Sequence, residues 1–231
     1  MLVIREYNRD NALAYARRWA FARNPLYYDY AGIGGNCTNF VSQCLYAGSC
    51  TMNYIPLYGW YYLSPAERTP SWTGVEYFYN FLTANKSVGP FAEEVDGSAV
   101  EVGDVVQLGR DEGGYYHTLL VVGRAGEDLL LAANTNDAFE RPLSSYEYDF
   151  ARFLHILGVR IEMPDTADCF TSLIEGVAIL PSSSSRPPLP PPSREEPPAE
   201  EEPPAEEEPP AVAPSEDTPV FRPSPSPYRP A

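Results

Sequence analysis

The chain has 231 residues, a formal net charge of −16 and a single lysine, Lys86. This charge argues against nucleic acid as a partner, because binding a phosphate backbone requires a basic surface. It also argues against tight adhesion to anionic membranes or wall polymers unless an adaptor intervenes. No membrane span or secretory signal is recognisable. We therefore expect a cytoplasmic location by default, and an extracellular one if another export route operates or if the start shown is not the natural one.

The composition changes sharply near Pro181. Eighteen of the 25 prolines lie beyond position 180, where Glu-Glu-Pro-Pro-Ala units repeat. Such a segment lacks the apolar residues that offset the entropy of ordering, and its carboxylates repel one another. We predict one folded domain, residues 1–180, followed by a disordered, partly polyproline-like tail, residues 181–231. Proline-rich segments of this kind can bind other proteins, which the sequence does not identify.

The first predicted element is a helix capped by Asp10. Its apolar residues recur at helical spacing as far as Ala20, and it is expected to end before Pro25.

A second helix begins at Cys37, directly after the glycine turn Gly34-Gly35. The unpaired N–H groups at the start of a helix favour a thiolate, so Cys37 is our candidate nucleophile. The spacing predicts a helix of roughly three turns that stops at Gly48. Its buried face is expected to hold Phe40, Val41, Cys44 and Leu45, whereas Ser42 and Gln43 are expected on a solvated or lightly packed face.

Four cysteines do not make the density of a disulfide scaffold, and we expect them to be reduced. Cys37 and Cys44 lie about 10 Å apart along one helix, which is too far for a bridge. Cys50 and Cys169 have no partner that the sequence identifies. The two histidines do not add a second ligand cluster, so we predict neither a metal nor a cofactor.

The stretch from Thr51 to Pro70 is rich in Tyr, Trp and Pro without a period, which predicts a long loop that could wall a substrate groove. A capping box at Thr73–Glu76 predicts a helix reaching about Ala84. Strand patterns follow at 105–108, 115–122, 129–133 and 153–159, and residues 173–180 are expected to add an edge element. Helices followed by an antiparallel sheet predict an α+β fold.

A cysteine nucleophile needs a base, and the chain has only His117 and His155. His117 follows the turn Gly113-Gly114 early in a strand, and from the residues alone we favour it by only about two to one. Asn134, at the end of the next strand, is our candidate for the residue that orients the base, with Asn136 and Asp137 as alternatives. In the alternative interpretation, all three residues form a polar turn without a catalytic role.

The run Gly35-Asn36-Cys37-Thr38-Asn39-Phe40-Val41-Ser42-Gln43 resembles the cysteine helix of the bacterial putative amidase domain family, a papain-like group related to the NlpC and CHAP cell-wall hydrolases. Further matches fall in that family's order over about residues 5–160: Tyr15–Ala20, Asn24–Tyr27, Trp60, Ser71–Thr73, Gly103–Val106, His117-Thr118 and Arg141–Leu143.

The resemblance implies a papain-like core and makes His117 the catalytic histidine. It also implies a tyrosine near the oxyanion, for which Tyr27 and Tyr28 are candidates, together with Asn36 as a substrate-binding candidate. Two positions depart from the pattern, because many members carry Asp where Asn36 stands and His where Asn134 stands.

The sequence thus predicts a cysteine-dependent amide hydrolase in which Cys37 attacks a carbonyl and His117 transfers the proton. From the resemblance, the substrate is a peptidoglycan stem-peptide or muramoyl amide. Two alternatives stay open: a catalytically inactive papain-like module that binds a peptide, and a cysteine acyltransferase.

Overall fold

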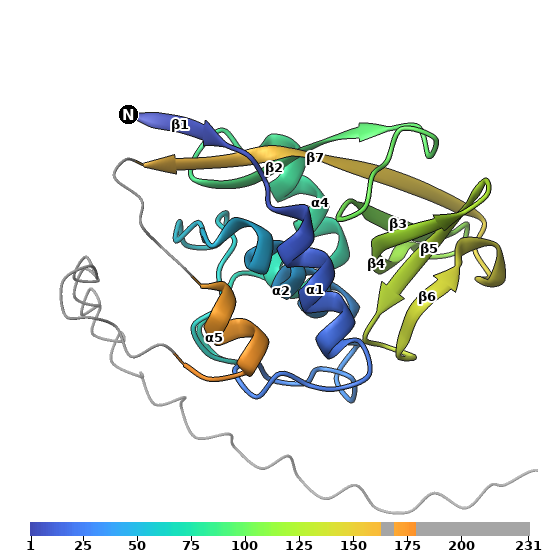
Figure 1. Ribbon diagram of the computed structural model, residues 1–231, viewed down its shortest axis with the longest axis horizontal. Helices are drawn as coiled ribbons and strands as arrows, with labels where there is room; N and C mark the ends of the chain where they lie inside the picture. The colour runs from blue at the N-terminus through green and yellow to red at the C-terminus, as the bar shows by residue number, and fades with distance from the viewer. Residues whose placement is uncertain (163–168, 179–231) are drawn as a thin grey trace, which may run out of the picture. The chain divides into compact units, whose positions relative to one another are not determined.

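The computed structural model describes residues 1–162 and 169–178 (Figure 1). The predicted tail, residues 181–231, lies outside this range, so its expected disorder stays a prediction. The helices are α1 (Arg9–Trp19), α2 (Cys37–Ser49), α3 (Pro70–Thr73), α4 (Val75–Ala84) and α5 (Phe170–Glu175), with a 3₁₀ turn η1 (Leu143–Ser145). The strands are β1 (Leu2–Arg5), β2 (Gly89–Val95), β3 (Val105–Arg110), β4 (Gly114–Ala125), β5 (Asp128–Ala133), β6 (Ala138–Pro142) and β7 (Phe150–Glu162).

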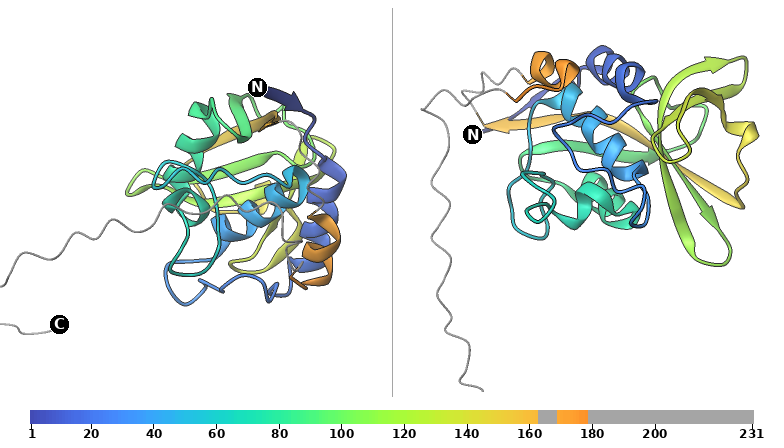
Figure 2. Two further views of the ribbon diagram at one scale, coloured as in Figure 1. Left: turned by 90° about the vertical axis from the view of Figure 1, so that its left-hand side faces the viewer. Right: turned by 90° about the horizontal axis from the view of Figure 1, so that it is seen from below.

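All strand pairs in the sheet are antiparallel, in the order β1-β7-β3-β4-β5-β6, with β2 on the other edge of β7. The α+β prediction is confirmed. The helices pack against one face of this sheet, with α2 next to β4 and α1 next to α2 (Figures 1 and 2). The sequence missed β1, β2 and β6, which are short or polar segments whose strand form depends on pairing with a neighbour.

The sheet carries a separate apolar cluster on each face. On the helix-covered face, Leu120 and Val122 of β4 join the core formed by α1, α2 and α4. On the opposite face, Leu119 and Val121 pack with Leu108 and with residues of the segment that follows β6, Tyr146 among them. Because successive side chains of a strand point to opposite faces, this division fixes where each residue of β4 points.

On one edge of β7, side chains form hydrogen bonds with backbone groups that no neighbouring strand pairs with. That edge pairs with β3 up to Leu154 and with β1 only from Val159, so Ile156 lies in the gap. The Asp104 carboxylate accepts the N–H of Ile156 (2.9 Å), and Arg9 donates to the Ile156 carbonyl (3.0 Å). Arg9 also pairs with Asp104 at 2.7 Å. These two side chains satisfy the backbone groups that a neighbouring strand would otherwise satisfy.

Two expectations for the helix boundaries need correction. The N-cap of α1 is Asn8, whose side chain accepts the N–H of Asn11, so Asp10 lies inside the first turn. The helix α2 runs through Gly48 and ends at Ser49, and its C-cap Cys50 adopts the left-handed conformation with φ 47°. Gly48 is needed for a close approach, because a Cβ there would lie 2.3 Å from the Tyr7 ring and 2.7 Å from the Asn8 carbonyl oxygen.

The prediction of a solvated face on α2 is wrong. Ser42 and Gln43 are buried, as are the predicted apolar positions Phe40, Val41, Cys44 and Leu45. Ser42 donates to the Trp72 carbonyl and accepts from the Trp60 indole, and Gln43 accepts from the Tyr15 hydroxyl. The helix is therefore surrounded by protein, and its polar side chains are satisfied by the elements around it.

The helix predicted after Thr73 forms as α4 and ends at Ala84 as expected, but Gly74 is its N-cap and no capping-box bond is made. Glu76 pairs instead with Arg152 of β7 at 3.0 Å. The stretch 51–70 is a loop with two isolated bridges, in agreement with the prediction. The edge element expected at 173–180 is wrong in its described part, because Leu173 lies in α5.

The expectation of four reduced cysteines is also wrong. Cys50 and Cys169 form a disulfide across a sequence separation of 119 residues, whereas Cys37 and Cys44 are free. The bridge joins the end of α2 to the start of α5, whose Leu173 is buried in the main core. Two cysteines so far apart in sequence give no local signal of pairing, so only the fold identifies them as partners.

Candidate functional site

Cys37 is the first residue of α2 and is buried, with 7% of its surface exposed. The preceding glycines, Gly34 and Gly35, have φ of 93° and 107°, values that require glycine and that turn the chain into the helix. The Cys37 sulfur lies 3.9 Å from the Thr38 hydroxyl. The free thiol therefore lies at the N-terminus of α2, beside the Thr38 hydroxyl.

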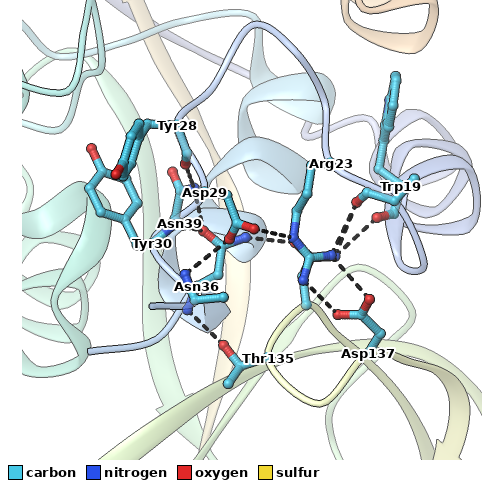
Figure 3. A network of polar contacts seen from close by, with 12 residues as sticks. Trp19, Arg23, Tyr28, Asp29, Tyr30, Asn36, Asn39, Thr135 and Asp137 are labelled. Carbon is cyan, nitrogen blue, oxygen red and sulfur yellow. Dashed lines mark hydrogen bonds and ion pairs between the residues drawn. The ribbon is translucent and has the colours of Figure 1, made fainter. Parts of the chain in front are cut away.

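Asn36 anchors the start of α2 through four hydrogen bonds (Figure 3). Its backbone N–H donates to the Thr135 hydroxyl (2.6 Å), and its amide donates to the Asn134 side-chain oxygen (2.6 Å). Its side-chain oxygen accepts from the backbone N–H of Tyr30 (3.1 Å) and from the Asn39 amide (2.8 Å). Asn36 is buried with every polar side-chain atom occupied, so it serves to position the helix start.

Asn134 follows β5 directly and is also buried. Its amide donates to the backbone carbonyls of Trp19, Ala20 and Ala22 at 2.9–3.2 Å, and its oxygen accepts from Asn36. It therefore joins the end of α1 to the start of α2, and its amide does not contact an imidazole. The two positions at which the chain departs from the resemblance are thus hydrogen-bonded to each other, as two neutral amides.

Thr118 is the residue of β4 that faces the start of α2. Its hydroxyl lies 2.9 Å from the Thr38 hydroxyl and accepts from the Gln107 amide at 3.1 Å. Gln107 and Thr118 are direct partners across the β3–β4 ladder. Hydroxyl and amide groups therefore line this side of the cysteine helix. They are buried and bonded to their neighbours, and they cannot act as a base at neutral pH.

His117 lies on the opposite face of β4. Its ladder partner is Leu108, a member of the far cluster, and its ring lies 6.1 Å from Tyr146 and 6.0 Å from Tyr116. Burial, with a smaller contribution from the nearby positive charge of Arg141, lowers the pKa of His117 to about 4. In this arrangement the imidazole is neutral at pH 7 and the structure does not bring it to Cys37.

His155 is engaged elsewhere. Its Nδ1 lies 2.7 Å from the fully buried Asp104 carboxylate and 3.5 Å from an Arg9 nitrogen. Its neighbours in β7, Leu154 and Ile156, point into the helix-covered core, so His155 faces the other way. Neither histidine of the chain therefore shares the sheet face that covers Cys37.

The alternatives to Asn134 are not close to His117 either. Asp137 makes two bonds of 3.0 and 3.1 Å to Arg23, which also binds Asp29 at 3.1 Å (Figure 3). Asn136 has a left-handed φ of 54° in the same turn. This turn fastens the chain beyond β5 to the loop after α1, in agreement with the polar-turn interpretation.

The tyrosine candidates form an aromatic cluster beside α2. Tyr27 stacks on Trp72 with ring centroids 5.9 Å apart, and burial raises its pKa well above the usual value. Tyr28 is 44% exposed, and its carbonyl accepts the Asn39 amide. The Trp72 indole in turn donates to the Asn39 oxygen at 2.9 Å. These contacts support packing around the helix entry, and Tyr28 alone of the two presents a large exposed surface.

A comparison with protein families gives the chain's classification. Residues 6–157 match the model of a family described as "Putative amidase domain", which covers more than half of the chain. The chain belongs to this family. The description indicates amide hydrolysis in general terms.

A curated relative of this amidase domain is described as "Uncharacterized protein YhbB" from Bacillus subtilis (strain 168), with 34% identity over 138 residues. The match covers 58% of this chain and 43% of the relative, so the chain spans less than half the length of that protein. No solved structure matches the chain. Among the described residues, no helix is long and apolar enough to cross a membrane.

Sequence reasoning missed Thr38, Thr118 and Gln107, the polar groups that adjoin the cysteine helix of the amidase domain. The strand pattern held a partial signal, because residues 118, 120 and 122 must share one face and 117, 119 and 121 the other. Both sets are apolar beyond the first position, so the pattern could not tell which face α2 covers.

Proposed function

We propose that this amidase domain is a cysteine-dependent amide hydrolase with a papain-like arrangement, in which Cys37 is the nucleophile. The observation that carries the proposal is a free thiol at the first residue of a buried helix, in a chain of an amidase family. The Cys37 sulfur would attack the amide carbonyl and form a thioester while the amine leaves with a proton. Water would then release the acid and regenerate the thiol. The proposed substrate, from the resemblance, is a peptidoglycan stem-peptide or muramoyl amide.

The proposal also needs a group that accepts the proton of Cys37. His117 remains our candidate, but its imidazole must reach the α2 face of β4. A shift of one residue in strand register exchanges the two faces, and the β3–β4 ladder already has an irregularity between Leu108 and Gly109, next to His117. If that bulge moved past Thr118, His117 would take the place of Thr118 opposite Gln107. In this proposal Asn134 is a positioning residue, because it holds the start of α2 through its hydrogen bond with Asn36.

A second function, amide binding without hydrolysis, is favoured by two specific observations. Both histidines lie on the sheet face away from Cys37, and the Asn36–Asn134 pair holds neutral amides where the resemblance expects an acid and an imidazole.

Alkylation separates these two functions. Iodoacetamide at about pH 6 reacts slowly with an unperturbed thiol of pKa about 8.5, so rapid labelling of Cys37 detected by mass spectrometry would identify an activated thiolate. Cys44 is the internal control, because it is fully buried and burial raises its pKa. Cys50 and Cys169 cannot react while they remain bridged.

For the hydrolase, we expect the low-pH labelling of Cys37 to be lost in His117→Ala and retained in His155→Ala. Turnover of peptidoglycan fragments should be lost in Cys37→Ala. If Cys37 labels no faster than Cys44 at pH 6 while the fragments still bind, the hydrolase proposal is wrong and the binding module is supported. Product analysis with added amines tests acyl transfer in place of hydrolysis.

A further inference from the structure

A cleft of about 690 Å³ lies between the loop that begins at Asn53 and one side of α4, away from the two histidines. The loop contributes Ile55, Leu57 and Tyr58, and the helix contributes Tyr77 and Phe81. Three of these side chains are strongly exposed: Leu57 by 70%, Tyr58 by 84% and Tyr77 by 61%. Exposed apolar side chains gathered around a concavity are typical of a binding site.

The loop wall is held in a fixed conformation. Leu57 has a left-handed φ of 64°, which costs energy for a branched side chain. The Gly59 N–H donates to the Ile55 carbonyl at 2.7 Å, and a Cβ on Gly59 would lie 2.2 Å from the Asn53 carbonyl oxygen. The backbone therefore presents Leu57 outward at a steric cost, and a wall of this kind binds a ligand without having to be ordered first.

Part of the polar lining of the cleft is committed to the fold. The amides of Asn53 and Asn85 are occupied, because they donate to the carbonyls of Val88 and Pro90 and accept the N–H groups of Ile55 and Ser87. Tyr58, Tyr77 and Asn80 also line the cleft, and their side chains carry donors that can bind a peptide or a carbohydrate. The choice between these ligands therefore rests on the apolar surface and on the charge of the cleft.

The charge of the cleft is positive although the chain carries 32 acidic residues. None of its 12 lining residues is acidic, and Lys86 lies among them. Lys86 is exposed, and its ammonium group makes no ion pair with a described residue. A single unpaired cation beside an apolar surface complements a carboxylate attached to an apolar group.

We propose that this cleft binds a peptide segment in which an apolar side chain lies next to a carboxylate. The apolar side chain packs against Leu57, Tyr58 and Tyr77, and the carboxylate pairs with Lys86. Ser71, a lining residue, precedes Trp72, whose indole bonds to Asn39 in the first turn of α2. Binding here does not depend on whether Cys37 is catalytic.

The test is an NMR titration of the full-length Cys37→Ala chain with its disulfide intact. The probes are the acid and the C-terminal amide of N-acetyl-Leu-Phe, and a neutral oligosaccharide of N-acetylglucosamine. We expect the acid to shift the backbone signals of residues 53–59 and 77–87. An exposed ion pair contributes up to about 1 kcal/mol, so the acid should bind about 2–5-fold more tightly than the amide.

Three variants make the result specific. Lys86→Met should reduce the affinity for the acid to that for the amide, whereas Lys86→Arg should retain it. Leu57→Gly removes an apolar contact and relieves the left-handed φ, so it should weaken both peptides about tenfold in a protein that is no less stable. Shifts of the same residues by the oligosaccharide but not by the peptides would overturn the proposal in favour of a glycan site. The absence of shifts with all three probes would also overturn it.

Discussion

At the residue scale, the start of α2 shows which side chains are available for chemistry and which are committed to structure. Asn36 and Asn134 use all their side-chain polar atoms to bind each other and the surrounding backbone, so their role is to hold the helix start in place. Cys37 retains its free thiol beside Thr38. The candidate nucleophile could be predicted from the sequence because a glycine turn and a helix start are local signals. The direction of the His117 side chain could not, because it depends on which face of β4 is covered.

The first prediction concerns His117 and the pH dependence of stability. Its pKa is about 4 in the folded protein and 6.5 without the fold, so the unfolded chain binds more protons between these values. The stabilising contribution of the neutral imidazole is therefore complete above pH 6.5 and is lost as the pH falls towards 4. We expect a loss of about 3 kcal/mol in the free energy of unfolding over this range.

Denaturant unfolding of the parent and of His117→Asn at intervals from pH 7 to pH 4 measures this contribution. The carboxylates titrate in both proteins, so the difference between the two curves isolates the histidine. As the pH falls, the free energy of unfolding of the parent should decrease relative to that of the variant. Parallel curves would show that His117 is accessible to protons in the folded state.

At the scale of elements, the local patterns predicted α2, α4 and the strands β3, β4, β5 and β7, all of which have strong apolar periodicity. The wrong predictions concern burial and disulfide pairing, which depend on tertiary contacts. Ser42 and Gln43 look like a solvated face but are buried, because α1 and α3 enclose that side of α2. The partner of Cys169 is distant in sequence, and no local pattern identifies it.

The second prediction concerns the edge of β7 that side chains complete. Asp104→Ala would leave the Ile156 N–H without its acceptor and Arg9 without its buried partner. Removing one member of a buried ion pair costs about 3–5 kcal/mol, and we expect a loss of that size in the free energy of unfolding. Glu101→Ala is the matched control, since Glu101 also pairs with Arg9, at 3.3 Å, but its side chain is 62% exposed. The control should lose less than about 1 kcal/mol. Equal losses would show that the buried carboxylate has no special role at this edge.

The third prediction concerns the bridge between Cys50 and Cys169, which fastens α5 to the end of α2. A disulfide that closes a long loop typically contributes about 2–5 kcal/mol. The double variant Cys50→Ala/Cys169→Ala should therefore unfold about 5–15 °C below the parent by calorimetry. Hydrogen exchange should be faster within α5, where the Leu173 carbonyl accepts from Trp19 and Asn24.

A reducing agent provides the control for the bridge. It should lower the midpoint of the parent to that of the double variant and should leave the variant unchanged, because Cys37 and Cys44 are already free. If the parent's midpoint does not respond to the reducing agent, the bridge either is absent in solution or does not stabilise the domain. A quantitative thiol titration of the unfolded parent distinguishes these outcomes, with two free thiols expected if the bridge is present.

At the scale of the whole molecule, two electrostatic effects oppose each other. Residues 1–180 carry a net charge of −10, because ten acidic residues and four arginines of the total of −16 lie in the predicted tail. This charge destabilises a compact state through self-repulsion, which salt screens. The ion pairs of Arg23 with Asp137 and of Arg152 with Glu76 stabilise it and are weakened by salt. Each such pair has a partly exposed partner and contributes at most about 1 kcal/mol. The excess of ten negative charges in residues 1–180 involves many more interactions, so we expect repulsion to dominate at neutral pH.

The fourth prediction follows: at pH 7 the unfolding midpoint should rise by a few degrees between about 10 mM and 150 mM NaCl, over which the screening length falls from about 30 Å to about 8 Å. The sequence pI of about 4.4 supplies a control within the same protein. Near that pH the net repulsion vanishes, so added salt should leave the midpoint unchanged or lower it through the ion pairs alone. A midpoint that falls with salt at pH 7 would mean that the ion pairs outweigh the repulsion. In that case, Glu76→Gln should remove part of the salt dependence, because it deletes one of these pairs.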